Sequence, residues 1–551
     1  MTNRITVGEL VAVALDRLGV DHAFGVVSIH NMPMLDALAR GNAIRFVMAR
    51  GEAGAANMAD GYARCANRLG VVFTSTGPGA ANAAGGLVEA LVAGTPLLHF
   101  TGQTARAHIG QGRGSVHDVP DQGAMLAAVS KAAYRIDDAD QALDIIARAA
   151  AEALAPPAGP VSIELPIDVQ KTLIERPAAL DDLMPPVIAP PAPDEAALDD
   201  LAALLIAAKR PLMWLGNGAR HAGGEAARLM ALGLGLVTSQ HGRAVVSEDH
   251  PLSLGAFNAT PEVVEFYRTV DLMVVAGSRL RGHETRDGAL ALPETLCRID
   301  VDEAAAGRGY GSALFVAGDA ALALAGLADR ITGRMAVDPA FAGDLAAVKA
   351  ATTAAYRANL GVYGELCDVV RAAAAPDVIW ARDITMNNST WGNRMFPLSA
   401  PEQNVYAVDA GIGQGMQQAI GASFAKGGAK TLAMCGDGGF FLNVSELWTA
   451  VQERCPVVFM VMNDGGYGVI RKIQDADYEG RRFFDDLLIP DLGDLARIAG
   501  LPFWRAGTVA AVGTALEAAF AVDGPALVEV DMQALGPFPP AALPPPPRPK
   551  E

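Results

Sequence analysis

The sequence predicts an α/β protein made of three doubly wound domains, each built around a mainly parallel sheet. Short apolar runs of strand length alternate with Ala-rich segments of helical length along the chain. Glycine-rich turns follow two of these runs in the last third of the chain, and such turns carry ligand-binding loops at the carboxyl ends of parallel strands. Pro-rich stretches separate the units.

Changes in composition divide the chain. The stretch 176–193 is too rich in proline for a helix or a central strand, and we expect it to be an extended crossing. The expected units are, in order, a first domain at 1–175, a middle domain at 194–335, a third domain at 350–536 and a Pro-rich tail at 537–551. Within the middle domain, apolar runs suited to strands lie at 211–215, 272–276 and 296–301.

The composition is that of a globular protein with several cores. Of 551 residues, 51% are hydrophobic and 19% are charged, which is too apolar for a disordered chain. The net charge is −18 and no basic cluster occurs, so nucleic acid and membranes are not expected partners. The five cysteines form no Cys-x-x-Cys pair and predict neither a disulfide framework nor a zinc site.

The amino-terminal segment predicts a cytoplasmic protein. Glu9 comes before any apolar core that could serve as a signal peptide. In addition, no apolar stretch approaches the length of about 18 residues that a membrane helix needs.

Two glycine-flanked aspartates in the third domain are the most informative feature of the sequence. Asp437 follows a strand expected at 431–435, and Asp464 follows one expected at 456–462. A helix expected at 444–453 connects the two strands, which makes them parallel. Because the carboxyl ends of parallel strands meet at one edge of a sheet, the two carboxylates should lie together.

The surrounding glycines point to a bound diphosphate. Gly436, Gly438 and Gly439 leave room for phosphate oxygens to approach the backbone, and N–H groups at a helix start face the anion. A main-chain carbonyl near Gly466 would complete a magnesium site with the two aspartates, because Mg²⁺ prefers oxygen ligands. A lone Gly-Asp-Gly after a strand is usually only a tight turn; two such loops one helix apart favour a magnesium diphosphate site.

The paired loops resemble the binding motif of thiamine diphosphate (ThDP) enzymes of the 2-oxo acid decarboxylase and acetolactate synthase superfamily. Residues 50–64 are similar to the pyrimidine-domain signature of this superfamily, with Glu52 at the position of its activating glutamate. Residues 75–82 resemble the segment that follows, which implies cofactor contacts at Gly77 and Asn82. The resemblance implies ThDP and Mg²⁺ as cofactors, and a pyrimidine-binding, a middle and a diphosphate-binding domain.

The resemblance implies further cofactor contacts in the third domain. Ile412 matches the superfamily's apolar wedge between the two rings of the cofactor, with Gly411 beside it. Thr385 lies in the segment 383–389, where the superfamily places diphosphate contacts, and a plain polar loop is an equal alternative there. Tyr467 belongs to the second aspartate loop. The glycine spacing around Ile412 is not the Gly-x-Gly-x-x-Gly of a dinucleotide loop, which disfavours a nicotinamide oxidoreductase.

Glu52 is the candidate catalytic carboxylate. ThDP reacts through a carbanion at C2 of its thiazolium ring, and a carboxylate hydrogen-bonded to N1′ of the aminopyrimidine favours the imino tautomer that removes the C2 proton. The structural alternative is a solvated first-turn glutamate that favours the helix dipole. The other motifs favour the catalytic role.

Candidate substrate-binding residues come from the first domain. All nine histidines lie at or before His283, so the third domain contributes none. His30 follows the first strand, where benzaldehyde lyase and related carboligases resemble this chain and place an active-site histidine. Gln103 lies in a segment similar to the same family, and we expect both residues to be catalytic. Gln111 and His117 are similar to a flanking segment, and their roles stay open.

The expected activity is decarboxylation of a 2-oxo acid and transfer of the enamine intermediate to a second carbonyl, as in an acetolactate synthase-like carboligase. The alternatives are a simple 2-oxo acid decarboxylase that releases an aldehyde, and a non-catalytic ThDP-binding homologue. Asp464 matches some acetolactate synthases, whereas many decarboxylases have Asn there. The turn at 215–218 could border FAD, which acetolactate synthases often contain, but no motif requires FAD.

Glu52 and the phosphate loops lie in different domains, so a cofactor that spans them must bind between domains. In the superfamily the two domains come from different subunits. The resemblance therefore implies a homodimer or homotetramer with the active site at the subunit interface.

Overall fold

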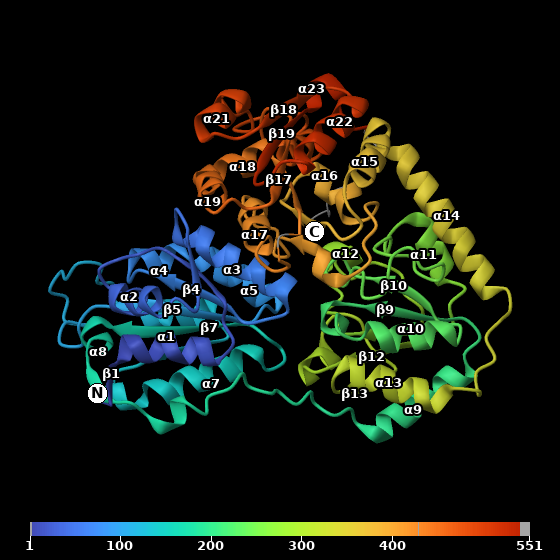
Figure 1. Ribbon diagram of the computed structural model, residues 1–551. Coiled ribbons are helices and arrows are strands. Elements are labelled where there is room, and N and C mark those ends of the chain that lie inside the picture. Colours follow the sequence, from blue (N-terminus) through green and yellow to red (C-terminus); the bar gives the residue numbers. More distant parts are fainter. Residues whose placement is uncertain (1–2, 428, 540–551) are drawn as a thin grey trace.

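A computed structural model describes residues 3–427 and 429–539. These residues form three α/β domains, each with its own parallel sheet (Figure 1). The first and third sheets have six strands and the middle sheet has five. The predicted fold class is therefore confirmed. Within the described ranges, no helix combines the length and the apolarity that crossing a membrane requires.

The first sheet has the strand order β3-β2-β4-β5-β7-β6, with every neighbouring pair parallel. Its strands are β2 (His22–Gly25), β3 (Arg45–Met48), β4 (Gly70–Thr74), β5 (Leu97–Gln103), β6 (Ala132–Arg135) and β7 (Pro160–Pro166). A separate antiparallel pair joins β1 (Arg4–Thr6) to β8 (Leu173–Glu175), which brings the two ends of the domain together.

The middle sheet has the order β10-β9-β11-β12-β13. Its strands are β9 (Pro211–Leu215), β10 (Gly235–Thr238), β11 (Leu272–Ala276), β12 (Leu296–Asp300) and β13 (Leu314–Ala317). Three of them match the predicted runs to within one residue. The strands β10 and β13 were not predicted, because runs of four residues are too short for periodicity to distinguish a strand from a loop.

The third sheet has the order β15-β14-β16-β17-β19-β18 and repeats the topology of the first. Its strands are β14 (Ile379–Arg382), β15 (Asn404–Tyr406), β16 (Thr431–Gly436), β17 (Val457–Asn463), β18 (Phe503–Ala506) and β19 (Ala526–Asp531). Strand order reverses between β14 and β16, as it does between β2 and β4. Such switch points are where open α/β sheets bind ligands.

The connection between β16 and β17 differs from the single helix expected at 444–453. It contains α18 (Asp437–Leu442), a 3₁₀ turn η7 (Val444–Glu446) and α19 (Leu447–Gln452). The first helix was missed because two glycines follow Asp437, and glycine disfavours a helix. Asp437 thus lies at a helix start.

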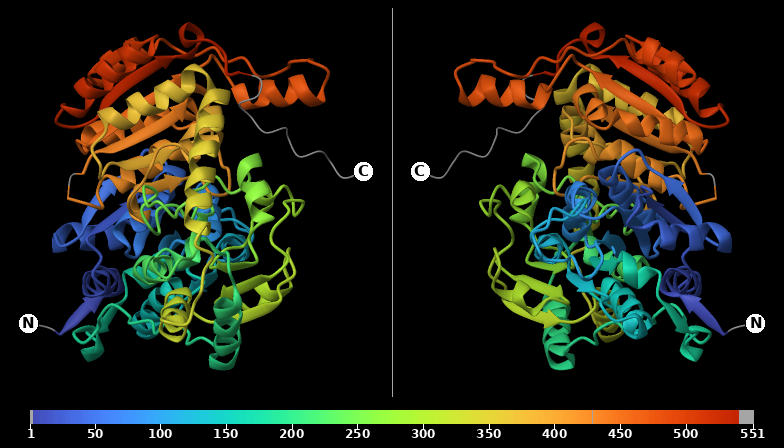
Figure 2. Two further views of the ribbon diagram at one scale, coloured as in Figure 1. Left: turned by 90° about the vertical axis from the view of Figure 1, so that its right-hand side faces the viewer. Right: turned by 90° about the vertical axis from the view of Figure 1, so that its left-hand side faces the viewer.

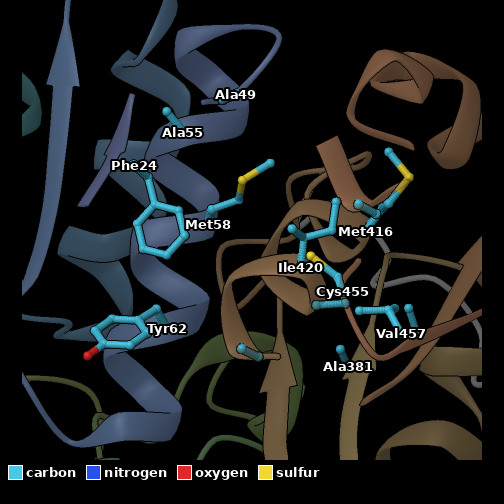
Figure 3. Packing of buried hydrophobic residues seen from close by; sticks show 14 of the residues in the cluster. Phe24, Ala49, Ala55, Met58, Tyr62, Ala381, Met416, Ile420, Cys455 and Val457 are labelled. Carbon is cyan, nitrogen blue, oxygen red and sulfur yellow. The ribbon is translucent and has the colours of Figure 1, made fainter. Parts of the chain in front are cut away.

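The first and third domains share one hydrophobic core. Figure 3 shows side chains of α3 (Glu52–Ala66), including Met58, facing Met416 and neighbouring residues of the third domain. The helix α17 (Gly415–Ala422) crosses α3 so closely that a Cβ on Gly421 would lie 1.8 Å from the carbonyl oxygen of Met58. Glycine at this crossing lets the two backbones touch.

Two long segments connect the domains. In the linker 176–193 the structure has one regular element, the 3₁₀ turn η2 (Ala178–Leu180). The helix α14 (Phe341–Leu360) extends from the middle to the third domain, so residue 350, where we expected the third domain to begin, lies inside a helix (Figures 1 and 2). Of the Pro-rich tail, 540–551 lie outside the described residues.

Candidate functional site

The two predicted metal ligands lie together at the carboxyl edge of the third sheet. Asp437 and Asp464 directly follow β16 and β17, which are parallel neighbours. Asp437 is 1% exposed, and neither of its carboxylate oxygens has a hydrogen-bond partner in the described chain. Burial and the neighbouring Asp464 raise the pKa of Asp437 to about 7, and burial also raises the pKa of Asp464. A buried carboxylate with free oxygens beside a second, partly buried carboxylate fits a hard divalent cation.

Main-chain groups must supply part of such a site, because no group of three or more His, Cys, Asp or Glu is arranged for a metal in the described ranges. Gly466 has φ +153°, and a Cβ there would lie 2.1 Å from the carbonyl oxygen of Asp485. Arg471 holds the loop, since it donates hydrogen bonds to the carbonyl oxygens of Asp464 (2.9 Å) and Gly465 (2.7 Å). Its guanidinium also pairs with the Asp485 carboxylate at 2.8 Å. These contacts of Arg471 fix the conformation of the loop.

Glycines bring the loops of the third domain into contact. A Cβ on Gly438 would lie 2.6 Å from the ring of Tyr467, and one on Gly436 would lie 3.2 Å from the methyl group of Thr385. The Thr385 hydroxyl accepts a hydrogen bond from the N–H of Asn388 at 3.0 Å and so caps the helix that follows β14. The predicted contacts from these segments therefore meet at one edge of the sheet.

The predicted wedge residue lies in the loop between β15 and α17, next to Gly411. Ile412 is 41% exposed. The next residue, Gly413, has a backbone angle φ of +85°. The N–H of Gly413 donates to the carboxylate of Asp383 at 2.9 Å, and burial raises the pKa of this carboxyl group to about 7. Asp383 was not predicted as a site residue, although its position directly after a strand was a signal.

Glu52 is the first residue of α3 and is 9% exposed. Its carboxylate accepts a hydrogen bond from the side-chain amide of Asn82 at 3.1 Å, and a Cβ on Gly79 would lie 2.6 Å from its second oxygen. Gly77 has φ +57°, and its N–H donates to the side chain of Gln122 at 2.5 Å. The structure therefore gathers three predicted residues of the first domain, and the solvated helix-start alternative for Glu52 does not describe it.

A residue of the third domain holds the start of α3. The carboxylate of Glu446 accepts hydrogen bonds from the N–H groups of Arg50 and Gly51, both at 3.0 Å, and from the hydroxyl of Thr449 at 2.7 Å. Burial raises the pKa of Glu446. Glu446 was not predicted as a site residue, because no local sequence pattern relates segments this far apart.

His30 lies beside a second histidine. Its Nδ1 atom is 3.3 Å from Nδ1 of His117, which in turn lies 3.5 Å from the hydroxyl of Ser75. Burial, followed by the charge of His117, lowers the pKa of His30. The two imidazoles form a paired donor and acceptor at the carboxyl edge of the first sheet.

Gln103 has a supporting position. It is 4% exposed, donates to Glu164 at 3.1 Å and accepts from the N–H of Thr104 at 2.7 Å. Gln122, which the sequence analysis did not single out, also donates to Glu164, at 2.9 Å, and to the carbonyl oxygen of Gly102 at 3.1 Å. A catalytic role of Gln103 stays a prediction.

A cavity of about 440 Å³ lies where residues of all three domains meet. Its lining includes the turn residues Asn217 and Gly218 and the side chains of Arg220, Arg281 and Arg298. The lining has six arginines against four acidic residues, and this excess of positive charge suits an anionic ligand.

Three family models match the chain in the order of its domains. They are the N-terminal TPP binding domain of thiamine pyrophosphate enzymes at residues 5–125, the central domain at 198–327 and the C-terminal TPP binding domain at 385–530. Glu52, Gly77 and Asn82 lie in the first range, and the aspartate loops lie in the last.

Curated relatives agree with the family models. The "Probable 2-ketoarginine decarboxylase" of Pseudomonas aeruginosa is 32% identical over 85% of this chain and 83% of its own length. The chloroplastic acetolactate synthase of Arabidopsis thaliana is 26% identical over 95% of this chain and 80% of its own. The large subunit of acetolactate synthase isozyme 1 of Escherichia coli is 27% identical, over 86% and 84%.

The chain belongs to the thiamine pyrophosphate enzyme family. It is a ThDP-dependent enzyme related both to acetolactate synthases and to a 2-ketoarginine decarboxylase, and the predicted superfamily is confirmed.

Proposed function

We propose that the protein binds ThDP and Mg²⁺, decarboxylates a 2-oxo acid and transfers the remaining carbon unit to a second carbonyl, as an acetolactate synthase-like carboligase. The observation that carries the cofactor assignment is the buried carboxylate of Asp437, which lacks a hydrogen-bond partner in the described chain and lies beside Asp464. Bound Mg²⁺ would compensate both charges and connect them to the diphosphate. A backbone carbonyl near Gly466 would be a third protein ligand.

Glu52 acts on the aminopyrimidine ring in this proposal. Asn82 donates to one oxygen of the Glu52 carboxylate, which leaves the other oxygen to bond N1′ of the ring. When bound, ThDP supplies a nucleophilic carbon that adds to the substrate carbonyl and stabilises the negative charge left when carbon dioxide departs. Ile412 would keep the two rings of the cofactor bent towards each other, because it presents an exposed apolar side chain at the loop tip.

Residues of the first domain handle the substrate. The paired imidazoles of His30 and His117 can donate a hydrogen bond to a carboxylate or carbonyl and return a proton to the product. The lowered pKa of His30 keeps it neutral near pH 7, so it acts as both donor and acceptor.

A screen of 2-oxo acids tests the proposal. Carbon dioxide release is measured for pyruvate, longer aliphatic 2-oxo acids and 2-ketoarginine, each with and without an aldehyde or 2-oxo acid acceptor. A carboligase forms a new carbon–carbon bond when the acceptor is present, and mass spectrometry of the products detects it. Carbon dioxide release without any ligated product would remove the carboligase assignment.

A simple decarboxylase is the second candidate. The histidine pair favours it, because aldehyde release requires a proton at the carbon from which carbon dioxide leaves. The relative named as a probable 2-ketoarginine decarboxylase points the same way. In the same screen this candidate yields one aldehyde per carbon dioxide, with or without an acceptor.

A homodimer or homotetramer with shared sites is part of the proposal. Large apolar side chains are exposed around both halves of the site: Val27, Ile29 and Val116 in the first domain, and Ile412 and Leu442 in the third. Each belongs to a residue that is at least 41% exposed. A second copy of the chain would cover these side chains and complete the cofactor site.

FAD is a further proposal for the cavity between the domains. The turn expected to border FAD lies in its wall, and three arginines there could bind a diphosphate. The visible absorption spectrum of the purified protein tests this, since bound flavin is yellow.

The cytoplasmic location stays a prediction from the sequence.

A further inference from the structure

The loop that presents Ile412 has an unfavourable backbone conformation. It connects β15 to α17, and both Ala410 (φ +63°) and Gly413 (φ +85°) lie in the left-handed region. Alanine disfavours this region, so surrounding contacts must hold the loop in place.

The first end of the loop is anchored by the other two domains. The carboxylate of Glu89, in α5 (Ala84–Ala93), accepts hydrogen bonds from the N–H groups of Val408 (2.6 Å) and Asp409 (2.9 Å). Arg281 of the middle domain donates to the carbonyl oxygen of Val408 at 2.7 Å. Residues 410–412 begin directly after this anchor.

The second end is anchored by Asp383, which follows β14 and is fully buried. Its carboxylate accepts hydrogen bonds from the N–H of Gly413 at 2.9 Å and from the N–H of Ile384 at 2.7 Å. A Cβ on Gly439 would lie 2.6 Å from a carboxylate oxygen of Asp383 and 3.3 Å from Cγ1 of Ile412. Asp383, Ile412 and the glycine-rich start of α18 are therefore packed together.

We propose that Asp383 is a positioning residue for the cofactor: its carboxylate fixes Gly413, so that Ile412 projects at the height the bent cofactor needs. This inference rests on the proposed function. Asp383 lies just outside the matched C-terminal family range, which begins at residue 385. The two candidate metal ligands, Asp437 and Asp464, follow other strands, so replacing the Asp383 carboxylate by an amide of the same size should leave both in place.

The anchor is tested first without cofactor. In Asp383→Asn, amide hydrogen exchange in the peptide that covers 407–414 should be at least about tenfold faster than in the wild type, because the N–H of Gly413 loses its carboxylate acceptor. Asp271→Asn is the control, since Asp271 also accepts two main-chain N–H groups, at 2.6 and 3.0 Å, but lies in the middle domain. It should leave this peptide unchanged. Equal exchange in wild type and Asp383→Asn would overturn the proposal.

The effect on the cofactor is tested by a double-mutant cycle. Asp383→Asn should bind ThDP with Mg²⁺ within about threefold of the wild-type affinity, but proton exchange at C2 of saturating ThDP should slow by about tenfold or more, as expected for a misplaced reacting group. Ile412→Ala should slow it likewise. If Asp383 acts through Ile412, the double variant is no slower than Ile412→Ala alone. If the slowing of C2 proton exchange in the double variant equals the product of the two single effects, Asp383 has a structural role, and the proposal is overturned.

The outcomes separate this inference from the proposed function. Absence of ThDP binding by the wild type, or C2 exchange that Glu52→Gln does not slow, would remove the function. Wild-type exchange that depends on Glu52 but not on Asp383 would remove only the inference. If Asp383→Asn does not fold, Gly413→Ala replaces it under the same criteria, because it strains the donor of the same hydrogen bond.

Discussion

Asp437 combines two properties that proteins rarely tolerate together. Its carboxylate is buried, and it has no hydrogen-bond partner among the described residues. An unpaired buried carboxylate is unfavourable, and the group responds by a raised pKa. A divalent cation removes the penalty, so the site gains more from a metal than a solvated pair of aspartates would.

Replacing either aspartate should separate metal binding from stability. We expect Asp437→Asn and Asp464→Asn to weaken Mg²⁺-dependent ThDP binding by at least about tenfold, or roughly 1.4 kcal/mol, because a neutral amide is a poorer ligand. When a chelator keeps the protein free of metal, Asp437→Asn should raise the melting temperature above that of the wild type, because a buried charge is removed. Calorimetric titration and thermal unfolding measure the two effects. Unchanged affinity in both variants, with Asp271→Asn as the control, would exclude this site.

Glu52 should affect the rate of proton exchange at C2 of ThDP and not the affinity for ThDP. We expect Glu52→Gln to bind ThDP with nearly wild-type affinity, while proton exchange at C2 slows by about two orders of magnitude or more, the range of general acid–base catalysis. Nuclear magnetic resonance of quenched samples measures this exchange. A non-catalytic ThDP-binding protein would show slow exchange in the wild type and no further loss in the variant.

Helix crossing joins the first and third domains. α3 and α17 meet at Gly61 and Gly421, where a Cβ would lie 2.1 Å and 1.8 Å from backbone oxygens of the other helix. Each helix also begins next to a site segment, since α3 starts at Glu52 and α17 follows the Ile412 loop. The crossing therefore sets the two segments relative to each other.

Adding a methyl group at this helix crossing should destabilise the protein. We expect Gly421→Ala to lower the free energy of unfolding by about 1–3 kcal/mol, because the backbones must separate to admit a methyl group. Gly224 offers the matched control: it lies in the helix α10 (Gly223–Ala231) with nothing within 4 Å of a Cβ position. Gly224→Ala should stabilise by up to about 1 kcal/mol, as expected for a helix. Denaturant unfolding measures the free energy of unfolding of both variants. Equal changes in Gly421→Ala and Gly224→Ala would contradict the close crossing of the two helices.

A buried histidine links three strands of the first sheet. His99 in β5 lies 2.8 Å from the hydroxyl of Thr74 in β4 and 2.9 Å from that of Ser162 in β7. Burial lowers the pKa of His99 to about 3. The imidazole is thus neutral in the folded protein and takes up a proton on unfolding below its ordinary pKa of 6.5.

The pH dependence of stability follows from this shift. The unfolded state binds the extra proton, so the contribution of His99 is complete above pH 6.5 and is lost as the pH falls towards 3. The slope from this group is at most about 1.4 kcal/mol per pH unit. Denaturant unfolding of the wild type and His99→Gln across this range measures it. The variant should be less stable at pH 7 and have the shallower slope; parallel curves would contradict the assignment.

At the scale of the whole molecule, the first and third sheets have the same strand order. His30 after β2 in the first sheet and Asp437 after β16 in the third follow strands at the switch point, whereas Glu52 after β3 and Ile412 after β15 follow the edge strands next to it. Two half-sites of one design suit a cofactor with two different ends, a ring system and a diphosphate.

The proposed assembly predicts a linked loss of cofactor and activity. On dilution, sedimentation velocity should show dissociation at the same protein concentration at which ThDP is released and activity falls. We expect Val27→Asp to shift this concentration upward by about tenfold, because a charge would be buried at the interface. Val187→Asp, at a residue that is 97% exposed in the linker, is the control. A fully active monomer would refute shared sites.

Local patterns predicted much of the fold and the site. The strands that carry the aspartate loops, and three strands of the middle sheet, were predicted to within one residue, because buried parallel strands are continuous apolar runs. Short strands such as β10 were not predicted, and neither was the helix α18, because its glycines disfavour a helix.

The sequence by itself determined the chemistry: which residues are aspartates flanked by glycines, which glutamate begins a helix, and that three α/β units follow one another. The tertiary structure alone decided the contacts between segments far apart in the chain. Glu446 holds the start of α3, and Asp383 and Glu89 hold the two ends of the Ile412 loop. The physical reason is that periodicity and turn chemistry act between neighbours, whereas the partner of a buried carboxylate is set by how the domains pack.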